Sequence, residues 1–187
     1  MATGFKLTRR GIAASLEPGE RDLLRSLFAD VLGMLEAAAP RDEDPLAALV
    51  GMDSTARVPE DPALLRLLPD AVRGDDGEAL EFRRLTERSL RESKAGALRG
   101  AALLLESSPV VLDDEQARWF ARALNDVRLV LGERLGLRTD EDAERLHGIT
   151  DPGKAENVED YLALVYNFVT WLQETLMTAM LGQLPRR

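Results

Sequence analysis

Apolar residues recur at helical spacing through residues 112–136 and mark the best-defined element of the chain. Asp113 stands at the N-cap position, and Gln116 follows three residues later, which is the spacing of a capping box. At about 100° per residue, the apolar side chains form a surface roughly 200° wide. It consists of Ala117, Trp119, Phe120, Ala121, Ala123, Leu124, Val127, Val130, Leu131 and Leu135. So broad a surface needs neighbours on at least two sides, so we expect this helix at the centre of the fold.

The same periodicity and its capping residues predict the other helices. Their ranges are 18–38, 45–50, 62–68, 78–106, 139–147 and 158–182. Alternating apolar residues on both sides of Gly11 predict a small β-hairpin over residues 5–16. Prolines and acidic residues punctuate residues 40–77, which are expected to form a partly flexible connector. The pattern therefore predicts a mainly α protein: a single-domain helical bundle over residues 1–187 with a small N-terminal β-hairpin.

The predicted helix over residues 78–106 carries an unusual apolar face. Its members are Phe82, Leu85, Ser89, Ser93, Gly96, Ala97, Gly100, Leu103 and Leu104, with small residues in the middle. Small residues let a second backbone approach closely. We expect this face to cross the central helix tightly. The alternative is a groove whose glycines let a ligand approach the backbone.

Basic residues on the other side of that helix are the most distinctive surface feature. Arg83, Arg84, Arg88, Arg91, Lys94 and Arg99 stand against three glutamates there, Glu81, Glu87 and Glu92. Pairs at i,i+4 favour an ordinary solvated face. The alternatives are a docking face for an acidic partner and a contact with phosphate backbone. We therefore take Arg84, Arg88, Arg91 and Lys94 as the candidate partner-binding residues.

Arg128 is a second candidate, because it projects from the apolar surface of the central helix. An unpaired buried charge is costly, so its guanidinium either reaches solvent or meets a carboxylate. We predict a structural ion pair with Asp160, Glu174 or Glu92. The alternative is a ligand carboxylate or phosphate at that position.

Composition narrows the function classes. The 187 residues are 45% hydrophobic and 30% charged, with a net charge of −9, which disfavours coating nucleic acid or anionic membrane by bulk charge. There is no cysteine, so disulfides and thiolate chemistry are excluded. No run of apolar residues is long enough for a membrane span, and no secretion signal stands at the start. We expect a cytoplasmic protein.

Catalytic signatures are missing from the sequence. It contains no Walker loop, GxGxxG, GxSxG, HExxH or CxxC pattern. His147 is the only histidine, and the acidic residues over 140–144 lack the spacing of a calcium loop. We therefore predict no catalytic residue, no metal site and no cofactor, and expect that the protein is not an enzyme.

Three segments carry a family resemblance: FRRLTERSLRESKAGALRG (82–100), LDDEQARWFARALNDVRLVLGERLG (112–136) and DYLALVYNFVTWLQETL (160–176). Together with the FKLTRRG opening they resemble an actinobacterial family classed as a domain of unknown function. Genes of that family often lie beside the gene of the ClpS adaptor of regulated proteolysis. The resemblance implies an intracellular helical protein and supplies no catalytic residue.

These observations predict a protein-interaction or adaptor module, with regulated proteolysis as one candidate process. The expected partner is a protein, no membrane partner is expected, and assembly into a homo-oligomer is left open. The alternative is a DNA-binding transcriptional regulator that uses the basic face of residues 78–106. Against that alternative, the sequence shows no helix-turn-helix with a short recognition helix.

Overall fold

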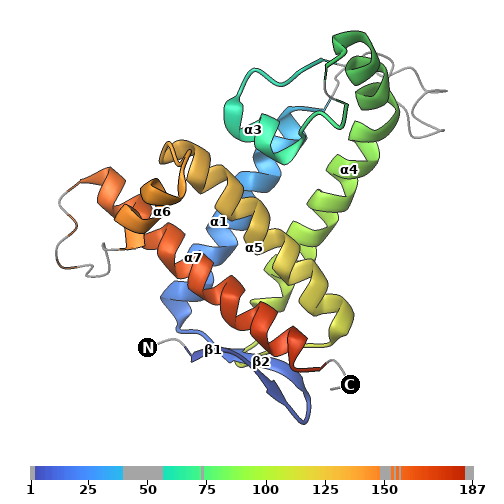
Figure 1. Ribbon diagram of the computed structural model, residues 1–187. Helices are drawn as coiled ribbons and strands as arrows, with labels where there is room; N and C mark the ends of the chain where they lie inside the picture. Colours follow the sequence, from blue (N-terminus) through green and yellow to red (C-terminus); the bar gives the residue numbers. More distant parts are fainter. Residues whose placement is uncertain are drawn as a thin grey trace.

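The computed structural model describes residues 3–39, 57–72, 74–147, 153, 155 and 157–183, and it confirms the mainly helical class (Figure 1). The helices are α1 (Pro18–Ala37), α3 (Pro62–Leu67), α4 (Asp76–Leu104), α5 (Asp114–Arg134), α6 (Asp140–His147) and α7 (Val158–Leu181). Their bounds follow the predicted ranges closely. The predicted helix over residues 45–50 and the middle of the connector lie outside the described residues. In the described part of the chain, no helix is long and apolar enough to cross a membrane.

The sheet has one strand more than the predicted hairpin. β1 (Thr3–Thr8) pairs with β2 (Gly11–Ser15), and β3 (Val110–Leu112) adds to the other edge of β2 in an antiparallel sense. Gly11 has a φ of 122°, and a Cβ there would collide with the carbonyl oxygen of Leu112. A glycine is therefore required both by the turn and by the third strand.

Helix α5 lies at the centre, as predicted, between α4 and α7 (Figure 1). Leu124 and Phe120 are fully buried, and the Phe120 ring meets the rings of Phe5 and Phe28 edge-on at centroid distances of 5.3 and 5.8 Å. The Asp113 side chain caps the helix by accepting from the backbone N–H groups of Glu115 and Gln116. The core therefore joins the sheet, α1 and α5 in one cluster.

Helix α4 is rotated relative to the sequence expectation. Phe82 and Leu85 are 44% and 43% exposed, while Arg83 and Arg91 are buried. Of the two glycines on the predicted face, Gly96 has open space beside it, and Gly100 meets α5 closely, where a Cβ would lie 3.2 Å from the Trp119 ring. The expectation for the first half of the face was therefore wrong: that half points to solvent, because the charged residues beside it find partners inside the fold.

Candidate interaction surface on α4

The four candidate basic residues fall into two pairs with different surroundings. Arg84 and Arg88 form the outer pair, with nitrogen-to-oxygen distances of 2.7 Å to Glu81 and 3.1 Å to Glu92. The side chains of those glutamates are 60% and 67% exposed. The arginine side chains are only 31% and 20% exposed, so it is the glutamate of each pair that a carboxylate of another protein could replace.

Arg91 and Lys94 form the inner pair. The Arg91 side chain is only 8% exposed, and its Nη2 donates to Glu87 Oε1 at 2.6 Å. Lys94 Nζ donates at 2.5 Å to Oδ1 of Asp126, a buried residue of α5. These two side chains are engaged in holding α4 in the fold, so they present less charge to a partner than the sequence pattern indicates.

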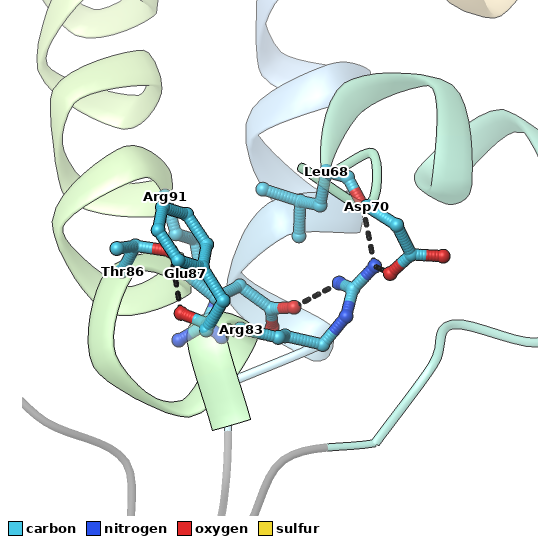
Figure 2. Close-up of polar contacts among 7 residues, drawn as sticks. Leu68, Asp70, Arg83, Thr86, Glu87 and Arg91 are labelled. Atoms are coloured by element: carbon cyan, nitrogen blue, oxygen red, sulfur yellow. Dashed lines mark hydrogen bonds and ion pairs between the residues drawn. The ribbon is translucent and has the colours of Figure 1, made fainter. Parts of the chain in front are cut away.

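Arg83 is the centre of a buried polar network that joins the segment after α3 to α4 (Figure 2). Its Nη2 donates to the Leu68 carbonyl oxygen at 3.0 Å and to Asp70 Oδ1 at 2.6 Å, and its Nη1 donates to Glu87. Glu87 thus lies between Arg83 and Arg91, one helical turn from each. The i,i+4 spacing of these three residues is visible in the sequence, but burial of the whole row is not.

A ridge of apolar and small residues lies on the exposed side of α4, which also carries Glu81 and Glu92, the exposed partners of Arg84 and Arg88. We call Phe82, Leu85, Ser89, Ser93 and Gly96 the α4 ridge, and all five are exposed. A large exposed apolar group on a helix is common singly, but Phe82 and Leu85 are neighbours at i,i+3 on one face. The α4 ridge can therefore contribute apolar area to a contact with another protein.

Arg128 has partners other than the carboxylates proposed from the sequence. Its Nη1 donates to Gln173 Oε1 at 2.8 Å, and its guanidinium lies 5.6 Å from the centroid of the Tyr166 ring. An amide oxygen and an aromatic face both stabilise a guanidinium without adding a negative charge. The structure thus gives Arg128 a bridging position between α5 and α7.

Asp126 is a functional candidate that the sequence analysis did not single out. It stands four residues after Arg122, a spacing typical of a solvated helix face, whereas the structure leaves it 1% exposed. Burial raises the pKa of the Asp126 carboxyl, and the hydrogen bond from Lys94 and the charges of Lys94 and Arg122 act in the opposite direction. A buried carboxylate with a raised pKa that lines a groove is a candidate for a binding site.

Fold and surface together define a mainly helical bundle with a small antiparallel sheet and an exposed apolar and basic surface on α4. The chain belongs to the family described as "Domain of unknown function (DUF2017)", whose model matches residues 2–180. The match agrees with the resemblance of the sequence to a family classed as a domain of unknown function.

Curated relatives of the chain come from mycobacteria. It is 33% identical to "Oxidative stress regulator AosR" of Mycobacterium tuberculosis (strain ATCC 25618 / H37Rv), over 90% of this chain and 82% of the relative. It is 35% identical to "Putative oxidative stress regulator AosR" of Mycobacterium leprae (strain TN), over 88% of this chain and 80% of the relative. No solved structure matches the chain.

Proposed function

We propose that this protein is a non-enzymatic regulator that acts by binding another protein through the α4 ridge. The observation that carries the proposal is the exposure of Phe82 and Leu85, two large apolar side chains on one face of a helix. Burying them against a partner would remove apolar area from water, which is the main driving force of protein association. The names of the relatives support a regulatory role.

The partner segment that fits this surface is an amphipathic helix with acidic residues beside its apolar face. Its apolar side chains would pack on Phe82 and Leu85, and small residues over 89–96 would let its backbone come close. Its carboxylates would replace Glu81 and Glu92 as partners of Arg84 and Arg88, at little cost because these glutamates are exposed. Arg91 and Lys94 would not contact the partner; their bonds to Glu87 and Asp126 would hold α4 in place.

The names of the relatives refer to oxidative stress, and the amino-acid composition limits how this chain could respond to an oxidant. The 187 residues contain no cysteine, so no thiol within them can be oxidised to a disulfide or a sulfenic acid. We propose that regulation runs through the availability of the partner and not through a thiol of these residues.

Affinity capture from cells grown with and without peroxide tests the proposal. Phe82→Ser with Leu85→Ser alters the α4 ridge, and Val158→Ser with Tyr161→Ser is the matched control, because these α7 residues are also exposed, at 75% and 55%. We expect one partner that the wild type and the α7 control retain and that the ridge variant loses. Binding of the purified partner, measured by calorimetry, should weaken at least tenfold in the ridge variant only.

An identical set of partners for all three proteins would contradict the α4 ridge as the contact. A link to regulated proteolysis is supported by the family resemblance. A protease subunit or protease adaptor among the ridge-dependent partners would bear it out.

Direct DNA binding is the competing function. If only Arg84 and Arg88 are able to neutralise phosphates, the log–log slope of affinity against salt should be roughly −2. Fluorescence anisotropy with a promoter duplex measures that slope. Sequence-specific binding that Arg84→Glu with Arg88→Glu abolishes would replace protein docking with DNA binding as the function.

A further inference from the structure

A groove of about 520 Å³ opens over α5 between α4 and α7. Helix α5 contributes Arg122 and Asp126, α4 contributes Leu90 and Lys94, and α7 contributes Gln173 and Met177. The volume lies within the range of about 300–1,000 Å³ that small-molecule sites usually have. The groove lies beside the α4 ridge but shares only Ser93 with it.

The most unusual group in this groove is the Asp126 carboxylate. Its side chain is 2% exposed, and only Oδ1 is bonded, to Lys94. Oδ2 is buried and has no hydrogen-bond partner among the described residues. A buried acceptor without a donor is unfavourable, and such exceptions in a folded protein often mark a site for a ligand or an ordered molecule.

The charge around Asp126 favours an anion with a donor. Lys94 and Arg122 carry two positive charges against the single negative charge of Asp126, a net charge of +1 in a chain whose total is −9. Arg122 is exposed and lies near enough to Asp126 to lower the pKa of its carboxyl. One ligand group should therefore be a carboxylate, and a second group should donate to Oδ2.

The remaining lining mixes polar side chains, Ser93, Asn125 and Gln173, with apolar ones, of which Leu90 and Met177 are the largest. Leu90 and Met177 are 37% and 42% exposed, and each stands on one side of the groove. A branched aliphatic chain laid between them would cover both side chains. Oδ2 itself is covered, so a donor reaches it only when a neighbouring side chain moves; Lys94 and Met177 line the groove and have long, flexible side chains.

We propose that this groove binds a small aliphatic acid that carries a hydroxyl or ammonium donor next to its carboxylate. The carboxylate binds Lys94 and Arg122, the donor binds Oδ2 of Asp126, and the aliphatic chain packs between Leu90 and Met177. This role is separate from partner docking on the α4 ridge.

Three probes with one carbon skeleton test the proposal: L-leucine, 2-hydroxy-4-methylpentanoate and 4-methylpentanoate. They differ only in carrying an ammonium, a hydroxyl or no donor beside the carboxylate. The chain has five methionines, so methyl NMR of the full chain gives few signals, and Met177→Leu assigns the one at the groove. We expect the Met177 signal to shift with L-leucine or the hydroxy acid at concentrations about tenfold lower than with 4-methylpentanoate.

Substitutions in the groove test which side chain binds each group of the probes. Asp126→Asn keeps the shape and should remove the tenfold advantage of the probes that carry a donor. Arg122→Gln should weaken all three probes about tenfold. Arg118→Gln, an exposed arginine one turn earlier on α5, is the control and should leave binding unchanged. Circular dichroism checks that each variant folds, and the exposed position of Arg122 keeps the test informative if Asp126→Asn does not fold.

A Met177 signal that none of the probes moves by about 20 mM, or equal affinities for the three probes, would overturn the proposal. The ridge variant Phe82→Ser with Leu85→Ser should bind the probes as the wild type does. Failure of partner docking and failure of ligand binding are therefore distinguishable.

Discussion

Helices α4 and α5 lie side by side, but α5 buries its apolar face, whereas the first half of α4 buries a row of charged residues. In α5 the apolar stripe faces the core, with Phe120 and Leu124 fully buried. In the first half of α4 a charged row, Arg83, Glu87 and Arg91, faces inward, and Phe82 stays exposed. Both helices are amphipathic, so amphipathicity by itself did not decide which face was buried.

The difference teaches that a charged row can be buried when its members neutralise one another. Glu87 bonds two arginines, and Arg83 also reaches the Leu68 carbonyl oxygen and Asp70 (Figure 2). The desolvation cost of each ion is offset by several charge-assisted hydrogen bonds. Exposed apolar residues on the opposite side of α4 are then available for a partner.

Of the changes considered, removing the Glu87 carboxylate, which Arg83 and Arg91 share, should lower the free energy of unfolding most. Glu87→Gln takes one negative charge away from two buried guanidiniums, and we expect a loss of about 3–5 kcal/mol in the free energy of unfolding. Glu92→Gln is the matched change on the same helix, where the side chain is 67% exposed, and should cost less than about 1 kcal/mol. Urea denaturation measures both, and equal losses would show that the Glu87 network contributes nothing special.

Shortening one leucine in each helix tests whether the apolar residues of α5 are buried and those at the start of α4 are exposed. Leu124→Ala leaves a cavity in the core and should cost about 2–5 kcal/mol. Leu85→Ala, at a position 43% exposed, should change stability by no more than about 0.5 kcal/mol. The same unfolding measurement applies. A loss above 2 kcal/mol for Leu85→Ala would mean that this side chain is buried in solution.

Arg128 is the charged exception beside the apolar stripe of α5. Because its described contacts are with Gln173 and the Tyr166 ring, Arg128→Met should cost about 0.5–1.5 kcal/mol. Adding Gln173→Leu should not increase the loss, because both members of the Arg128–Gln173 hydrogen bond are then gone. A loss of 3 kcal/mol or more for Arg128→Met alone would point to the buried ion pair that the sequence predicted.

The end of α5 offers a counterpart to the Glu87 network in which the carboxylate side chain is 6% exposed but its two arginines are open to solvent, and its effect should be the smallest. Arg138 and Arg66 hydrogen-bond Glu133 and lower the pKa of its carboxyl from 4.5 to about 2. A lowered pKa in the folded state means that the stabilisation is complete above pH 4.5 and disappears as the pH falls toward 2. The two arginines are about half exposed, so solvent screening should keep the contribution under about 1 kcal/mol.

Glu133→Gln tests this dependence. Its stability should lie slightly below that of the wild type at pH 7, and the two should converge between pH 4.5 and 2. A difference that grows in acid would contradict the sign.

The helices were predictable because their signals are local. Capping boxes, prolines and periodicity fixed the ends of α1, α4, α5 and α7 to within a few residues. The third strand was not predictable in this way, because Val110–Leu112 forms a strand only where β2 presents an edge to it. The burial of Asp126 was not predictable for a similar reason, since its partner Lys94 comes from another helix.

The sequence by itself determined the helical class, the central place of α5 and the lack of any cysteine chemistry, because these follow from local spacing and from composition. Only the tertiary structure decided which face of α4 is buried, which of its cations are occupied and where a groove opens beside Asp126. The physical reason is that burial of a charge depends on partners distant in sequence. The pattern along one helix does not contain that information.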